Sequence, residues 1–408
     1  MSGFENNKLN EDYRDWKKKT TIFLCSQGIS LFGSSLVAYA IIWYITLTTT
    51  SGSMMTISII MSFLPQVLIS LFAGVWADRY NRKHIIMLSD GLVAVSTLIL
   101  AIFFFIGYRE IWLIFAVSAI RSIGSGIQSP AVSAILPQFV PKDKLMKVNG
   151  IKGSIHSLIT LLSPAAGGVI LTMFSVEASF FVDVITAAIA ISIMTALKVG
   201  KHIEYITRNE LEAISELKKG FKYINNNKLI KNLLTYYVFF FLLVSPAAFL
   251  TPLMVARSYG AEIWRLTLNE ILFSGGAVLG GIIISSWGGF KSHMKTIAMS
   301  CFGFGICTVL LGFSPNFIFF LTAMGMAGIF VPIFNAVESV MIQESVEQGM
   351  QGRVFGIIEI FAVGLMPVGM LFYGPLADVI KIETILVITG FLIAALACLI
   401  YKNNKQEI

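Results

Sequence analysis

Charged residues are scarce in this sequence. Only 13% of its 408 residues are Asp, Glu, Lys or Arg, whereas 56% are hydrophobic. Soluble domains carry roughly 25% charged residues, so this composition excludes an ordinary soluble protein. The longest polar interruption, residues 198–231, is too short to fold as a separate nucleotide-binding domain.

Other absences narrow the function. The chain has no Gly-x-x-x-x-Gly-Lys-Ser/Thr loop for ATP phosphates, no cluster of His, Cys and carboxylates for a metal, and no nucleophile elbow. Its four cysteines all lie in apolar runs, which argues against a disulfide framework; they are Cys25, Cys301, Cys307 and Cys398. We therefore expect no enzyme activity, cofactor or metal, and an energy source that is an ion or solute gradient.

Long apolar runs dominate what is present. Runs of about 20 residues recur along the chain, each long enough to cross a bilayer as a helix, and they lack the alternation of β-barrel strands. We predict an all-α membrane protein with twelve transmembrane helices. The predicted parts are a segment 1–19, a six-helix bundle 20–197, a loop 198–231, a second six-helix bundle 232–401 and a tail 402–408.

The basic residues are distributed unevenly between the two predicted sides. If the N-terminus is inside, the cytoplasmic segments hold 25 of the 30 Lys and Arg residues and the outer loops hold four. The positive-inside rule then places both termini in the cytoplasm. The net charge of +7 is thus a topology signal in the plasma membrane, not a sign of nucleic-acid binding.

The polar loop 198–231 carries apolar residues at three- and four-residue spacing between lysines. This pattern predicts a basic amphipathic helix on the inner membrane surface, with a flexible linker as the alternative. The two halves that the loop separates also resemble each other weakly, since Val148–Ile151 aligns with Val354–Ile357. Parallel repeats of this kind favour an internal duplication.

The most specific local pattern is Gly74-Val-Trp-Ala-Asp78-Arg79-Tyr-Asn81-Arg82-Lys83, between the second and third apolar runs. It resembles motif A of the major facilitator superfamily, which implies a gating role for Gly74, Asp78, Arg79, Arg82 and Lys83. A glycine permits close helix approach, and Asp78 could cap a facing helix N-terminus near Gly352. Asn81 replaces the usual glycine, although asparagine also tolerates a left-handed turn.

Two charged residues stand inside predicted spans. Arg121 lies near the bilayer centre, where a cation is costly, in a stretch that resembles motif B. Asp183 is isolated in the sequence among Phe and Val, and a desolvated carboxyl can take up and release a proton. We predict that Arg121 and Asp183 couple transport to protons; purely structural roles for both remain the alternative.

The fifth span contains an antiporter-like stretch. Ser163, Pro164, Gly167 and Gly168 resemble motif C, although Ser163 and Ile159 replace glycines of that motif. Kinked, glycine-rich helices also occur without any exporter role. Three further acidic candidates lie near the inner ends of spans; they are Asp90, Glu338 and Glu359.

The resemblance covers the whole chain and is nearest to the macrolide-efflux branch of the superfamily. Ser26–Ser30 and Glu216–Ile224 carry this finer likeness. It implies two pseudo-symmetric six-helix bundles that alternate access to a central cavity. The predicted cavity residues are Gln27, Ser30, Tyr39, Gln128, Tyr236, Tyr237 and Asn335.

We expect a monomer that exports bulky amphipathic molecules such as macrolides, with protons and the lipid bilayer as its other partners. Three alternatives stay open at this point. One is a siderophore or metabolite exporter, and another is a facilitator or importer of the same fold. The third is a receptor or assembly factor that transports nothing.

Overall fold

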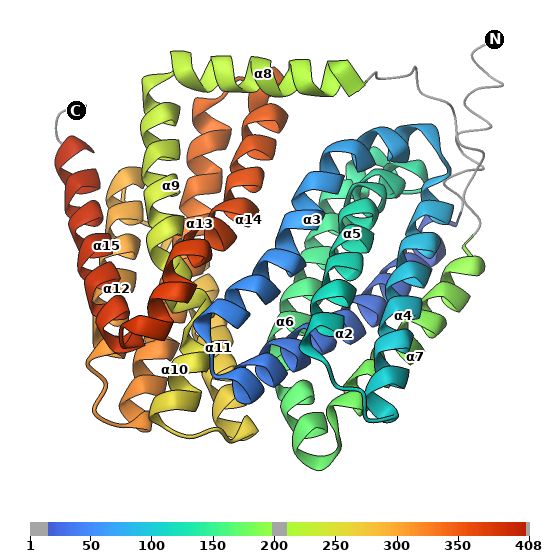
Figure 1. Cartoon of the computed structure of the whole chain (residues 1–408). Helices are drawn as coiled ribbons and strands as arrows, with labels where there is room; N and C mark the ends of the chain where they lie inside the picture. Colours follow the sequence, from blue (N-terminus) through green and yellow to red (C-terminus); the bar gives the residue numbers. More distant parts are fainter. Residues whose placement is uncertain (1–14, 198–209, 405–408) are drawn as a thin grey trace, which may run out of the picture. The chain divides into compact units, whose positions relative to one another are not determined.

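The computed structural model describes residues 15–197 and 210–404, except the side chains of Leu71, Asp78, Lys142, 210–217, Gln348, Gly349, Glu359 and Asn404. Within these residues the chain is helical and contains no strand. Twelve helical segments are long and apolar enough to cross a membrane, with α9 and α10 counted as one. The predicted fold class, an all-α protein with twelve spans, is confirmed (Figure 1).

The helices follow one another with short connections. Those of the N-terminal half are α2 (Trp16–Thr49), α3 (Gly52–Arg79), α4 (Arg82–Phe105), α5 (Ile111–Ile135), α6 (Leu145–Met173) and α7 (Val176–Thr195), with short 3₁₀ turns at Leu136–Gln138 and Lys142–Lys144. Those of the C-terminal half are α8 (Glu210–Asn226), α9 (Lys228–Phe249), α10 (Thr251–Ser258), α11 (Ile263–Trp287), α12 (His293–Gly312), α13 (Phe317–Ser345), α14 (Gln348–Val379) and α15 (Ile382–Asn404).

Asparagine side chains start several of these helices. Asn81, Asn227 and Asn316 each accept a hydrogen bond from a backbone N–H of the first turn of α4, α9 and α13. Such caps satisfy donors that a helix leaves unpaired. At the other end of α11, Gly288 adopts a left-handed conformation with φ of 76°, which stops the helix.

The contacts divide the chain into two compact units. Unit 1 comprises the described residues of 1–41 and 61–210, and unit 2 comprises those of 42–60 and 211–408. The tip of the first hairpin, Ile42–Ile60, therefore packs in unit 2, although the rest of α2 and α3 belongs to unit 1. The bundle boundaries expected from the sequence stay predictions.

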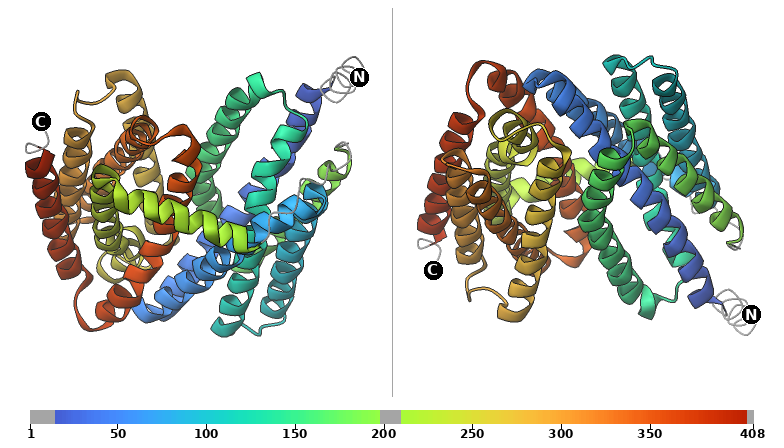
Figure 2. Two further views of the ribbon diagram at one scale, coloured as in Figure 1. Left: turned by 90° about the horizontal axis from the view of Figure 1, so that it is seen from above. Right: turned by 90° about the horizontal axis from the view of Figure 1, so that it is seen from below.

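Glycines let helices of unit 2 meet at their backbones. A Cβ atom at Gly276 of α11 would lie 1.9 Å from the carbonyl oxygen of Gly325 in α13. A Cβ atom at Gly328 of α13 would lie 2.1 Å from the carbonyl oxygen of Phe273 in α11. Small residues are a usual device for close packing in membranes, where lipid offers no hydrophobic contrast. Figure 2 shows these helices beside each other within unit 2.

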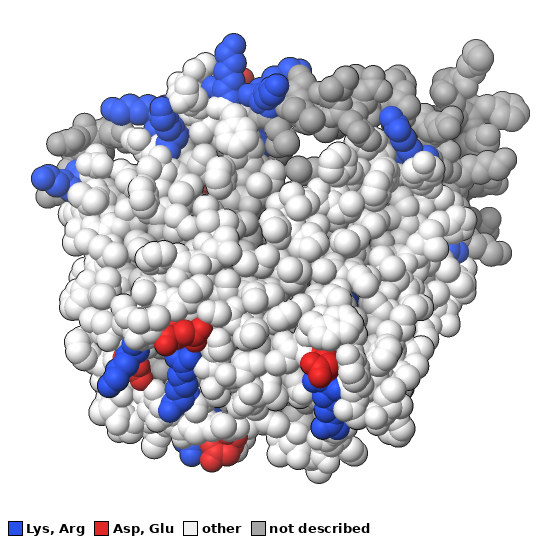
Figure 3. Space-filling model, viewed as in Figure 1, with Lys and Arg blue, Asp and Glu red and all other residues white. Residues whose placement is uncertain are grey.

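Charge is segregated on the surface of unit 2. On the face shown in Figure 3, Lys and Arg gather at the end where α8 lies, both signs occur at the opposite end, and the surface between is uncharged. The loop predicted to be an amphipathic helix does contain a helix, α8. Its Phe221 ring contacts Phe361 of α14 edge-on at 6.3 Å. Residues 198–209 of that loop lie outside the described part of the chain.

Candidate functional site

Unit 1 contains a buried ion pair that joins two helices. Arg121 of α5 pairs through Nη1 with Oδ2 of Asp183 in α7, and the two side chains are 11% and 1% exposed. Two charges buried together in this way are stable only if further hydrogen bonds satisfy their remaining polar atoms.

Those further hydrogen bonds come from α2 and α4. Thr97 Oγ1 donates to Oδ2 of Asp183 at 3.1 Å, and Ser34 Oγ donates to Oδ1 at 3.1 Å. Arg121 Nη2 donates to the carbonyl oxygen of Ser34 at 3.2 Å. Asp183 is thus isolated along the chain but surrounded by polar partners in the structure. The role of Asp183 and Arg121 in coupling stays a prediction.

A glycine allows α2 to reach this ion pair. A Cβ atom at Gly33 would lie 3.1 Å from the Cα atom of Asp183 and 1.9 Å from Oγ1 of Thr186. Any larger residue would push α2 away from α7. The next residue, Ser34, is thereby held within hydrogen-bond distance of the carboxylate.

A polar pocket of about 360 Å³ adjoins the ion pair within unit 1. Ser34, which binds Asp183, also lines this pocket. Its polar lining residues come from α2 to α6; they are Gln27, Ser30, Ser34, Gln66, Asp90, Ser125, Gln128, Ser129, Lys152 and His156. The pocket combines a carboxylate, two basic side chains and amides, so it offers both donors and acceptors to a ligand.

Asp90 is the buried carboxylate of this pocket and is only 4% exposed. Its Oδ1 atom accepts hydrogen bonds from Ser30 Oγ at 2.6 Å and Gln128 Nε2 at 2.9 Å. Its Oδ2 atom is buried without a hydrogen-bond partner among the described residues.

The predicted cavity residues are only partly brought together. Gln27, Ser30 and Gln128 line the pocket of Asp90, whereas Tyr39, also in unit 1, does not. Sequence reasoning ranked Asp90 as a secondary candidate, because no pattern in the sequence shows that it faces Ser30 and Gln128.

The remaining predicted cavity residues belong to unit 2. Tyr237 is buried and stacks on Phe241 at 4.3 Å between ring centroids. The Tyr236 hydroxyl accepts a hydrogen bond from Asn403 Nδ2 at 2.8 Å, and Asn335 is exposed.

The acidic candidates of unit 2 differ in their surroundings. Glu338 is buried on α13, and its Oε1 atom has no hydrogen-bond partner among the described residues. Glu270, which sequence reasoning missed, accepts a hydrogen bond from Asn269 Nδ2 at 3.1 Å. The side chain of Glu359 is not among those described. Within the described residues, no group of three or more metal-ligating side chains occurs.

The basic residues of the motif A stretch bind helix ends. Arg82 Nη1 donates to the carbonyl of Ala134 in the last turn of α5 at 2.8 Å. Lys83 Nζ donates to the carbonyls of Thr195 and Leu197 at the end of α7, both at 2.8 Å. Cations at these positions satisfy free carbonyls and interact favourably with the helix dipole.

Other residues of this stretch depart from expectation. Asn81 is the N-cap of α4 with φ of −63°, so the expected left-handed turn is wrong. No described atom of unit 1 lies within 4 Å of the position a Cβ atom would take at Gly74. Arg79 is exposed, and the side chain of Asp78 lies outside the described residues.

The antiporter-like stretch lies inside α6. Ser163, Pro164, Gly167 and Gly168 are all buried. The Ser163 hydroxyl is buried without a hydrogen-bond partner among the described residues. The four residues therefore form a packed face of α6, and their antiporter role stays a prediction.

The sequence profile of the Major Facilitator Superfamily matches residues 23–366. The chain belongs to the major facilitator superfamily. The match spans both halves of the chain and includes Arg121, Asp183 and Asp90.

Curated relatives extend this result. Macrolide efflux protein A of Streptococcus pyogenes is 28% identical over 400 residues, which are 97% of this chain and 98% of that protein. Macrolide efflux protein A of Enterococcus faecalis is 27% identical over 78% of this chain and all of that protein. The predicted resemblance to the macrolide-efflux branch is confirmed.

Solved structures agree on the fold. A POT family transporter in complex with a thioalcohol-conjugated peptide superposes with a TM-score of 0.74 at 12% identity over 95% of this chain and 96% of that one. The nucleoside transporter NupG, as its D323A mutant, gives a TM-score of 0.71 at 14% identity over 95% and 99%. The chain is therefore a multi-pass membrane transporter by fold and family.

Proposed function

We propose that this protein exports bulky amphipathic molecules, with macrolides as the first candidates, in exchange for protons. Both termini lie in the cytoplasm, and the chain acts as a monomer in the plasma membrane. The observation that carries the proposal is the Arg121–Asp183 pair beside the polar pocket of Asp90. Proteins named for macrolide efflux match nearly the full chain, which supports the cargo class.

Asp183 and Asp90 have different roles in this proposal. We assign the exchanged proton to Asp183 in the state in which helix movement has separated it from Arg121. Asp90 has no arginine or lysine in ion-pair contact among the described residues, so it can hold a proton beside the ligand. A movement that changes the Arg121–Asp183 distance would change proton affinity between states, as an antiporter requires.

The test is uptake of radiolabelled erythromycin, a macrolide, into proteoliposomes with and without an imposed pH gradient. Asp183→Asn should abolish uphill transport but retain downhill exchange, since only the former needs proton turnover. The matched control is Asp143→Asn, which removes an exposed carboxylate from a loop and should leave both activities intact. Uphill transport by Asp183→Asn would contradict the proposed coupling.

An endogenous metabolite is a second candidate substrate, and the same transport assay tests it. The putative bacilysin exporter BacE of Bacillus subtilis strain 168 is 25% identical over 95% of this chain and 94% of that protein. An exporter of an endogenous metabolite therefore remains the alternative function. Erythromycin flux indistinguishable from that of empty liposomes would favour this alternative.

A further inference from the structure

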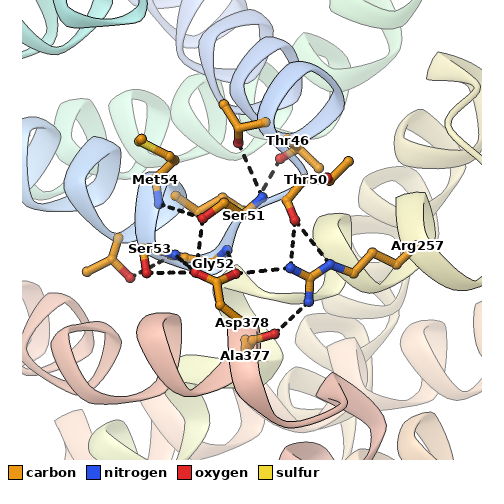
Figure 4. Close-up of polar contacts among 12 residues, drawn as sticks. Thr46, Thr50, Ser51, Gly52, Ser53, Met54, Arg257, Ala377 and Asp378 are labelled. Atoms are coloured by element: carbon orange, nitrogen blue, oxygen red, sulfur yellow. Dashed lines mark hydrogen bonds and ion pairs between the residues drawn. The ribbon is translucent and has the colours of Figure 1, made fainter.

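The carboxylate of Asp378, in the last turn of α14, binds the N-terminus of α3. Its Oδ1 atom accepts the backbone N–H of Gly52 at 2.7 Å, and its Oδ2 atom accepts that of Ser53 at 2.9 Å. The hydroxyls of Ser53 and Ser51 also donate to Oδ2, at 2.7 and 3.0 Å (Figure 4). A carboxylate at this position satisfies free N–H groups and complements the helix dipole.

Arg257 of α10 completes this cluster. Its guanidinium donates to Oδ1 of Asp378 at 3.1 Å and to the carbonyl of Ala377 at 2.6 Å. It also donates to the carbonyl of Thr50, at 2.6 and 3.2 Å (Figure 4). Thr50 has φ of 47°, a left-handed conformation that costs energy for a β-branched residue. The arginine therefore binds the strained turn between α2 and α3 to the end of α14.

The helix backbones also touch at this point. A Cβ atom at Gly52 would lie 2.2 Å from the carbonyl oxygen of Gly374, and one at Gly374 would lie 2.7 Å from that of Gly52. Thr56 Oγ1 donates to the carbonyl of Met370 at 2.9 Å. We call Asp378, Arg257, Gly52 and Gly374 the outer clasp, because the charge distribution predicts this end to face outward.

The outer clasp holds a part of the N-terminal half within unit 2. The hairpin tip Ile42–Ile60 belongs to unit 2, while the same two helices continue into unit 1. Opening the clasp would therefore free the first hairpin from the C-terminal half at the outer side.

The sequence around Asp378 recurs at the other end of α3. Gly374-Pro-Leu-Ala-Asp378 ends α14, and Gly74-Val-Trp-Ala-Asp78 ends α3. Gly52 of α3 lies against Gly374 of α14 and Thr56 binds the carbonyl of Met370, so the two helices run in opposite directions there. Each helix thus carries its aspartate at the membrane side where the other helix begins.

We propose that Asp378 is an outer gate residue that is reciprocal to Asp78, which rests on the alternating access proposed above. Asp378 caps α3 and stabilises the conformation in which the outer ends of the two helices are joined. The sequence predicts that Asp78 caps α14 in the opposite conformation. Exchange of one cap for the other keeps the two states close in energy, so that a ligand or proton can shift the balance.

The glycines support this exchange. Gly374, the glycine of the sequence that ends at Asp378, is in backbone contact with α3. At its counterpart Gly74, no described atom of unit 1 lies within 4 Å of the position that a Cβ atom would take. At Gly352, near the start of α14, no described atom of unit 2 lies within 4 Å of that position. Neither of these two glycines is therefore in close contact with another helix of its own unit.

The test measures distances between spin labels, without substrate or a pH gradient, in a cysteine-free background reconstituted in nanodiscs. One label pair, at Met54 and Val379, reports on the outer ends of α3 and α14. A second pair, at Tyr80 and Glu347, reports on the inner ends. All four side chains are exposed, so a spin label can replace each of them without entering the core.

Asp378→Asn should increase the ratio of outer-open to outer-closed molecules about three- to tenfold, the size expected for one charged cap. Arg257→Gln should act in the same direction. Asp78→Asn should shift the ratio the opposite way, and the double variant Asp78→Asn/Asp378→Asn should return close to the original ratio.

The matched control is Glu383→Gln. Glu383 lies in the first turn of α15, at the same end of unit 2, and accepts a hydrogen bond from Ser258 at 2.6 Å. The Glu383→Gln variant therefore removes one charge at this end without changing Asp378. An unchanged outer distance in both Asp378→Asn and Arg257→Gln, or an equal shift in Glu383→Gln, would overturn the gate. Distances that shift in protein that transports no erythromycin would instead count against the proposed cargo alone.

Discussion

Arg121 on α5 and Asp183 on α7 form a buried ion pair in unit 1, and each is bound further by groups of α2 or α4. Four helices therefore converge on one charge pair. Any change in the rotation or tilt of one helix changes the hydrogen bonds of the pair. This arrangement makes the pair both a structural link and a candidate switch.

Loss of Arg121 alone should destabilise the protein more than replacement of both Arg121 and Asp183 by apolar residues. Arg121→Ala leaves a buried carboxylate without its cation, which costs about 3–5 kcal/mol, whereas replacing both partners by apolar residues costs far less. Thermal unfolding in detergent should rank Arg121→Ala below Arg121→Met/Asp183→Leu. If the double variant is the less stable of the two, the cost of an unpaired buried carboxylate is smaller than the contribution of the ion pair.

Asp90 should be required for transport rather than for folding. Asp90→Asn keeps an acceptor for Ser30 and Gln128 but cannot exchange a proton. We expect normal membrane insertion and at least a tenfold loss of pH-driven erythromycin uptake, in line with roughly 10²–10⁴-fold effects of proton-transfer groups. Ser30→Ala is the matched control, since it removes one hydrogen bond and leaves the carboxyl. Full uptake by Asp90→Asn would exclude a proton site there.

Gly276→Ala should disrupt unit 2, whereas the neighbouring Gly275→Ala should not. The new Cβ atom at 276 would lie 1.9 Å from a backbone oxygen of α13, while no described atom lies within 4 Å of the position at 275. Overpacking of this kind costs about 1–3 kcal/mol. The yield of folded protein after size-exclusion chromatography measures the difference, and equal yields would show that α11 and α13 can separate without loss.

Lys83→Gln should lower the free energy of unfolding by up to about 1 kcal/mol, because it removes a cation from the end of α7. The exposed Arg79 of the same stretch provides the comparison, and Arg79→Gln should be closer to neutral. Denaturant unfolding of the purified variants gives both values. An unchanged free energy of unfolding for Lys83→Gln would mean that Lys83 does not stabilise α7.

The predicted orientation can be tested with single cysteines in a background without the four native ones. Asn226→Cys, at an exposed position at the end of α8, should react with an impermeant thiol reagent only in broken cells. Glu110→Cys, in the exposed turn before α5, should react in intact cells. The positive-inside rule requires this pattern, and the reverse labelling would invert the topology.

The number of spans was readable from the sequence, and so was the all-α class. Hydropathy is a local property of successive residues, and a run of about 20 apolar residues has one stable arrangement in lipid. The motif A stretch and the full-length likeness to macrolide-efflux proteins were equally legible, because they depend on residue identity alone.

Only the tertiary structure decided which polar groups meet. Asp183 is isolated along the chain, yet it is bound by Arg121, Thr97 and Ser34. Asp90 and Ser30 are 60 residues apart but share a hydrogen bond. Such pairings depend on the rotation of each helix and on how closely glycines such as Gly33 let helices approach, and neither quantity is encoded in local hydropathy.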